Sequence, residues 1–153
     1  MRQTYRALAG LIALGVVVQA ALIAYAWFAA LHDIDGGAII DENYEGNAGH
    51  VGHGVVGMIA VPALALIFLI VSFVTAKAVP SGRTWAGIVF AAVVVQVALA
   101  FLSFGAPVVG ALHGINALVI LGASLRAMRL ATTPAAETTG AGTAATSGTT
   151  LPV

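Results

Sequence analysis

Long apolar stretches alternate with short polar segments along the chain. The apolar stretches occupy residues 7–31, 52–76, 85–104 and 107–125. Each is close to the roughly 20 residues that an α-helix needs to cross about 30 Å of hydrocarbon. Backbone polar groups in lipid must be paired within their own segment, as in a helix, and no alternating barrel-strand pattern is present. The sequence therefore predicts an all-α fold, a four-helix transmembrane bundle.

The composition agrees with a lipid environment. Of the 153 residues, 60% are hydrophobic and only 8% are charged, whereas soluble domains carry about 25% charged residues. The expected partner is the lipid bilayer, and a nucleic-acid partner is not expected. The chain contains no Cys, which excludes disulfides, thiolate metal sites and a covalently attached c-type haem.

The charges are sorted between the two sides of the predicted bundle. The six cations lie in three places: before the first stretch, between the second and third stretches, and after the fourth. Five of the six acids lie between the first and second stretches. The positive-inside rule predicts a multi-pass protein of the inner (plasma) membrane with both termini cytoplasmic. Arg2 and Arg6 would also suit a signal peptide, but the first stretch is long for one. Residues 1–130 form the predicted transmembrane domain, and residues 131–153 a disordered cytoplasmic tail.

A short motif occurs twice. Residues 16–22 read VVVQAAL and residues 93–99 read VVVQVAL, and in each case a His-Gly pair follows on the next span, at 53–54 and 113–114. We therefore expect two duplicated helical hairpins, related by an axis along the membrane normal. A cleaved leader has no reason to share a motif with the third stretch, which also favours four retained spans.

The duplicated histidines are the candidate chemistry. Two neutral imidazoles at matched depth can ligate a haem iron from above and below, and neighbouring glycines would leave room for a flat macrocycle. The predicted cofactor is haem b, with His53 and His113 as metal ligands, and the predicted cofactor-binding residues are His53, His113, Gly57, Gly110, Gly114 and Asn116. A single His near a helix end can also simply reach interfacial water. Intramembrane amides usually form interhelical hydrogen bonds, the expected role of Gln19 and Gln96. Interfacial anchors are expected at Trp27, Trp85 and Tyr5.

These motifs carry a family resemblance. The two Val-Gln runs, His53 with Gly57, and the run Leu112-His113-Gly114-Ile115-Asn116 resemble a family of small four-span bacterial membrane proteins of unknown function. The likeness covers about residues 2–129. More distantly, the duplicated hairpin with one His in each half is similar to membrane b-type cytochromes and to the haem A synthase architecture. That resemblance implies that His53 and His113 are axial haem ligands.

Three functions are compatible with these observations. The leading hypothesis is a b-type haem electron-transfer protein or redox subunit with bis-His ligation near the outer face; such ligation leaves no open iron position, which favours a carrier over an enzyme. The alternative is a cofactor-free accessory subunit of a larger membrane complex, such as a respiratory one. The third is an outward metal-binding protein or small transporter that uses the acidic outer loop, although the irregular spacing of that loop favours a merely solvated segment. The candidate ligands are His32, Asp33, Asp35, Asp41, Glu42, Glu45, His50 and His53. No phosphate loop, HExxH or GxSxG motif is present.

Overall fold

The computed structural model describes residues 1–132, and all regular structure within this range is helical. The first span is α1 (Arg2–Asp35). The second is continuous but has three parts, α2 (Ala48–Val55), the π-helix η1 (Val56–Ala60) and α3 (Val61–Val74). The third and fourth are α4 (Gly82–Gly105) and α5 (Val109–Leu130). These four spans are long and apolar enough to cross a membrane, which confirms the predicted all-α, four-span fold. Apart from its first two residues, the predicted tail lies outside the described range.

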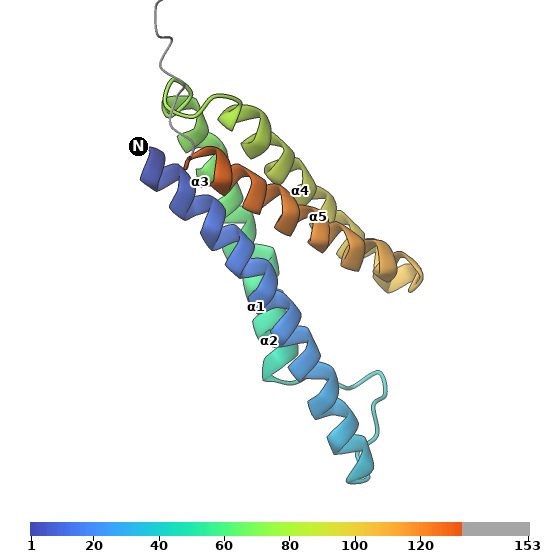
Figure 1. Cartoon of the computed structure of the whole chain (residues 1–153). Coiled ribbons are helices and arrows are strands. Elements are labelled where there is room, and N and C mark those ends of the chain that lie inside the picture. The colour runs from blue at the N-terminus through green and yellow to red at the C-terminus, as the bar shows by residue number, and fades with distance from the viewer. Residues whose placement is uncertain (133–153) are drawn as a thin grey trace, which may run out of the picture.

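The four spans form two hairpins. Within the first hairpin α1 packs against α2 and α3, and within the second α4 packs against α5. Between the hairpins, α1 contacts α5 and α3 contacts α4. The repeat makes α1 equivalent to α4 and α3 equivalent to α5, so these two contacts are equivalent as well. The hairpins lie together near the N-terminus and diverge toward the opposite end (Figure 1).

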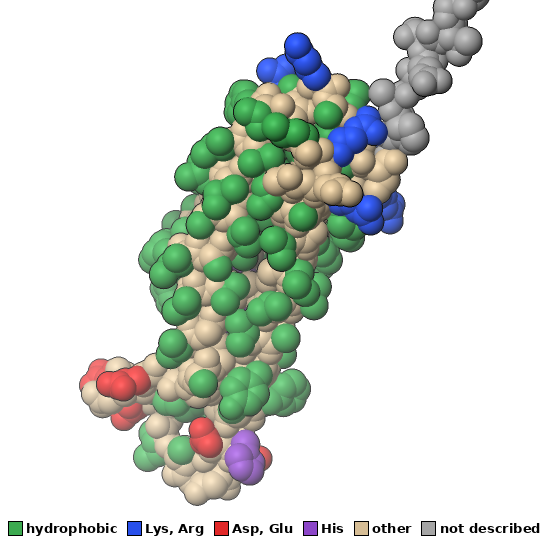
Figure 2. Space-filling view, turned by 90° about the vertical axis from the view of Figure 1, so that its left-hand side faces the viewer, with side chains coloured by type: hydrophobic (Ala, Val, Ile, Leu, Met, Phe, Trp, Pro, Cys, Tyr) green, Lys and Arg blue, Asp and Glu red, His purple; other side chains and the backbone are tan. Residues whose placement is uncertain are grey.

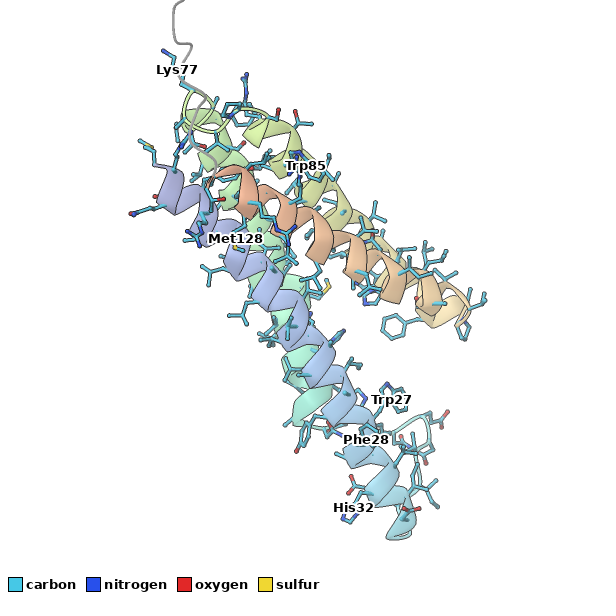
Figure 3. All side chains as sticks on the ribbon, in the orientation of Figure 1. Trp27, Phe28, His32, Lys77, Trp85 and Met128 are labelled. Atoms are coloured by element: carbon cyan, nitrogen blue, oxygen red, sulfur yellow. The ribbon has the colours of Figure 1, made fainter. Side chains whose placement is uncertain are left out.

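Opposite charges lie at opposite ends of the bundle (Figure 2). The basic end comprises the N-terminus, the α3–α4 turn and the end of α5; Lys77 marks it in Figure 3. The acidic end comprises the end of α1 and the loop of residues 36–47, and His32 marks it in the same view. Between the ends the visible face is largely apolar (Figure 2), and Leu14, Phe73 and Leu118 are each more than half exposed. Such a surface needs lipid around it, and the chain is a multi-pass membrane protein.

The buried hydrophobic cluster lies mainly in the basic half of the bundle. The ring of Tyr5 contacts that of Phe68, with ring centres 4.7 Å apart, and its hydroxyl donates to the carbonyl oxygen of Gly82 at 2.8 Å. Tyr5 is fully buried, so its prediction as an interfacial anchor is wrong. The reason is the partner on α4, because a buried tyrosine hydroxyl is tolerated when it is hydrogen-bonded.

Burial extends the repeat beyond the motif visible in the sequence. Ala9 and Ile12 on α1 are fully buried, and so are Ala86 and Val89 on α4. Each member of the second pair lies 77 positions after its counterpart, the same spacing that separates Gln19 from Gln96. The first helix of each hairpin therefore presents the same face to the core.

The second helices differ by one inserted residue. His113 lies 60 positions after His53, whereas the buried positions that follow them are 59 apart: Val61 with Ile120, and Ala65 with Ser124. The π-helix η1 accommodates the extra residue, and its last bond runs from the Val61 N–H to the Val56 carbonyl. Pro62 follows at once and has no N–H for a regular helical bond, which favours the irregularity here. The π-helix thus keeps both His53 and the buried stripe below it facing the core despite the insertion.

Candidate functional site

A cavity of about 510 Å³ lies between the two hairpins, on the acidic-end side of the packed core. All four spans line it. Its polar side chains are Gln19, His53, Gln96 and His113, and the rest of its lining is apolar or glycine. The volume lies within the range of about 300–1,000 Å³ that is typical of small-molecule and cofactor sites.

The two imidazoles of the repeat meet in this cavity. The ring centres of His53 and His113 are 6.3 Å apart and the rings are inclined by 56°. An imidazole nitrogen bonds a first-row metal at about 2.0 Å and lies about 1.1 Å from its ring centre, so ligands on opposite sides of one metal have centres about 6 Å apart. The separation is compatible with two imidazoles sharing one metal ion.

The same backbone contact orients both rings. The Nδ1 atom of His53 lies 3.1 Å from the carbonyl oxygen of Gln19, and that of His113 lies 3.1 Å from the carbonyl oxygen of Gln96. A carbonyl only accepts, so in each neutral ring Nδ1 carries the hydrogen and Nε2 keeps a free lone pair. Metal-binding histidines commonly donate their other N–H to a carbonyl in this way. Both halves thus present the tautomer that a metal requires.

In the second half, side-chain amides strengthen this contact. Gln96 Nε2 donates to the backbone carbonyl of His113 at 3.0 Å. Asn116 Nδ2 donates to Gln96 Oε1 at 2.7 Å and to the carbonyl of Ala92 at 2.8 Å. These bonds connect α4 to α5 around His113. The interpretation of Gln96 as an interhelical hydrogen-bonding residue is confirmed.

The first half lacks the corresponding network. Val56 stands three residues after His53, where the second half has Asn116 three residues after His113. Accordingly, the buried Oε1 of Gln19 has no hydrogen-bond partner among residues 1–132. A Cβ atom added at Gly57 would overlap the Gln19 amide. The small size of Gly57 therefore makes room for Gln19.

Four of the six predicted cofactor-binding residues line the cavity, and two lie outside its lining. His53, His113, Gly57 and Gly114 line the cavity. Asn116 is outside the lining and supports Gln96, and Gly110 faces Ser103 of α4, whose Oγ would lie 3.8 Å from an added Cβ.

Gly54, one of the glycines expected to leave room beside the histidines, also lines the cavity. A Cβ at Gly54 or Gly114 would meet no neighbouring atom within 4 Å, so there is open space beside each imidazole. The sequence prediction missed the orienting carbonyls of Gln19 and Gln96. The shared Val-Val-Val-Gln run was the available signal for them.

The acidic-end loop is organised around a helix cap. Asn47 caps α2 by accepting from the N–H groups of Gly49 and His50, while His50 Nδ1 accepts from the Asn47 N–H at 3.3 Å. The His50 ring also packs edge-on against Trp27 and Tyr44. Among residues 1–132, no three His, Asp or Glu side chains come together as a metal site would require. His50 therefore has a structural role, and the described loop offers no multidentate cation site.

No family model, curated protein or solved structure matches the chain. The family resemblance of the sequence motifs stays a prediction, and the function rests on the residues of the cavity.

Proposed function

We propose that this membrane protein binds one b-type haem between His53 and His113 and carries single electrons. The observation that supports this is the pair of imidazoles, each held through Nδ1 by a backbone carbonyl, with ring centres 6.3 Å apart in an apolar cavity. A bound haem would supply one-electron iron chemistry, and while both histidines hold the iron no position would be free for a substrate. The protein is then an electron carrier or redox subunit rather than an enzyme.

Each part of the cavity has a role in this proposal. His53 and His113 would hold the iron, and the carbonyls of Gln19 and Gln96 fix the orientation of their rings. Open space beside Gly54 and Gly114 admits the macrocycle. The apolar lining excludes water, which influences the redox potential. Because no Lys or Arg lines the cavity, the haem carboxylates belong at its mouth, in water.

The spectrum of the purified full-length protein tests the proposal. We expect a low-spin b-type signal in the reduced-minus-oxidised difference spectrum, altered by His53→Ala and by His113→Ala. His32→Ala and His50→Ala are matched controls outside the cavity lining and leave the signal unchanged. Colourless protein from cells supplied with haem precursor, or a signal unaffected by either cavity substitution, contradicts the proposal.

A size substitution tests whether the cavity is the binding site. Neither Gly114 nor Gly122 has a neighbour within 4 Å of an added Cβ, but only Gly114 lines the cavity. We expect Gly114→Phe to remove most of the haem while the apoprotein still folds, and Gly122→Phe to leave the haem content unchanged. Equal haem content in both variants would place the cofactor elsewhere.

We further infer that the protein lies in the inner (plasma) membrane. The basic end of the bundle, which contains the N-terminus and the end of α5, would face the cytoplasm. The grouping of the cations at one end supports this orientation through the positive-inside rule. The haem would then lie toward the outer face. A larger respiratory or redox complex is the proposed electron-transfer partner.

The second candidate is a cofactor-free accessory subunit of such a complex. The observation in its favour is that no cation lines the cavity to pair with haem carboxylates. Colourless protein that co-purifies with a membrane complex at fixed stoichiometry would support this candidate over the first.

A further inference from the structure

The two halves of the site restrain their histidines unequally. Both rings bond a carbonyl through Nδ1 at the same distance. Around His113, Gln96 and Asn116 add three further bonds between α4 and α5. Around His53 the corresponding amide oxygen, Oε1 of Gln19, is buried and has no partner within the part of the chain that the structure describes. His113 is therefore held more firmly than His53.

The helix that carries His53 is also less regular. The π-helix η1 begins three residues after His53, and Pro62 follows it. In contrast, α5 is α-helical throughout Val109–Leu130. A π segment forms i→i+5 hydrogen bonds and so contains one more residue than the α-helical turn it replaces. Such segments are often found at functional sites. Movement of His53 relative to the core therefore disrupts fewer bonds than movement of His113.

We propose that His113 is the permanent iron ligand and that His53 is displaceable by a small uncharged ligand such as carbon monoxide. This inference rests on the proposed haem function. In the exchange, the bond between iron and His53 Nε2 breaks and a bond from iron to the carbon of carbon monoxide forms. The iron remains ferrous throughout, and His53 keeps its proton on Nδ1, so no further oxidant, reductant or proton is needed.

The Gln19 amide gives the vacated position its chemical character. Gln19 lines the cavity with His53, and its Nε2 lies beside Gly57. Hydrogen-bond donors in such a pocket determine which small ligands an iron retains. An amide carries no charge, and the rest of the surrounding lining is largely apolar, so the site favours small neutral molecules with a weak acceptor atom over anions.

Alanine substitutions at the two histidines give the primary test, made on the full-length protein reduced with dithionite. We expect His53→Ala to retain haem in a five-coordinate form and to bind carbon monoxide at least about tenfold faster than the wild type. We expect His113→Ala to lose most of its haem. Equal retention in the two variants, or faster carbon monoxide binding only in His113→Ala, overturns the asymmetry.

A second variant restores the missing partner. Val56→Asn places an amide where the second half has Asn116, within the helix that carries His53. We expect it to slow carbon monoxide binding several-fold, whereas Val56→Leu, which adds bulk without an amide, leaves the rate close to that of the wild type. An equal effect of the two substitutions would show that the Gln19 amide does not control His53.

Hydrogen exchange of the haem-free protein separates the two proposals. The amides of residues 53–60 are expected to exchange faster than those of residues 113–120, because η1 and the unpartnered Gln19 lie in the first half. Equal protection overturns the inference of unequal restraint even if haem binds. A wild-type protein that binds no haem overturns the proposed function and the ligand exchange together, whatever the exchange rates.

Discussion

The Tyr5 hydroxyl connects the two hairpins at the basic end. Tyr5 is fully buried and donates to the Gly82 carbonyl across the hairpin interface. The contribution of Tyr5 is therefore to packing and hydrogen bonding. The two residues are also repeat equivalents, separated by the same 77 positions as Gln19 and Gln96.

Tyr5→Phe removes this bond while keeping the ring contact with Phe68. We expect a loss of about 1 kcal/mol in the free energy of unfolding, the usual net value of one hydrogen bond. Tyr25→Phe is the matched control, because Tyr25 is 59% exposed, and it is expected to have no measurable effect. Unfolding in detergent, followed by circular dichroism, compares the two; equal stabilities would show that the Tyr5 hydroxyl contributes nothing.

At this scale the sequence predicted the candidate ligands but not the contacts that orient them. Two histidines in equivalent copies of a repeat indicated a shared site, and they do line one cavity. The role of Gly57 as space for Gln19 could not be predicted, because it depends on the rotation of α1 against η1. The burial of Tyr5 likewise depends on a partner carbonyl 77 positions away.

The helical elements were predictable in number and place, but their ends were not. Structure begins at Arg2 and continues to Asp35 in α1, beyond the apolar stretch 7–31, because charged and polar residues can extend a helix past the hydrocarbon. The π-helix also escaped prediction. A proline inside a helix favours a local irregularity, but the one-residue insertion becomes visible only when buried positions of the two copies are compared.

The insertion leads to a deletion experiment. Removing Ile59 together with Pro62→Ala gives the first copy the spacing of the second, so we expect a folded bundle in which η1 becomes α-helical. Removing Val119, the equivalent residue of α5, rotates everything beyond it by about 100° and is expected to prevent folding. Size-exclusion profiles and helical content in detergent distinguish the outcomes, and similar behaviour of both deletions would argue against a repeat shifted by one residue.

The cap of α2 is the second prediction for an element. Asn47 satisfies two amides at the helix start and also donates to the Ala26 carbonyl of α1 at 2.8 Å. We expect Asn47→Ala to cost about 1 kcal/mol of stability. His50→Glu retains an acceptor at the third helical position, where Glu completes the usual capping box, and is expected to cost less than His50→Ala. Thermal unfolding ranks the three variants, and the reverse order for the two His50 substitutions would exclude the side-chain cap.

The charges of the whole molecule are separated between its two ends, and this separation predicts its orientation in the membrane. The chain contains no native cysteine, so single cysteines can report its orientation. We expect Ala38→Cys, in the loop at the acidic end, to react with a membrane-impermeant maleimide in intact cells. Pro80→Cys, in the turn at the basic end, is expected to react only after lysis. The opposite labelling pattern would reverse the proposed orientation.

The uneven packing of the two hairpins also has a consequence for assembly order. The buried core lies in the basic half, and the cavity lies beyond it where the hairpins diverge. The two hairpins can therefore pack against each other at the basic end before the cavity is filled. A prosthetic group would then enter between the diverging ends of the hairpins after the chain is inserted, without separating the packed basic end.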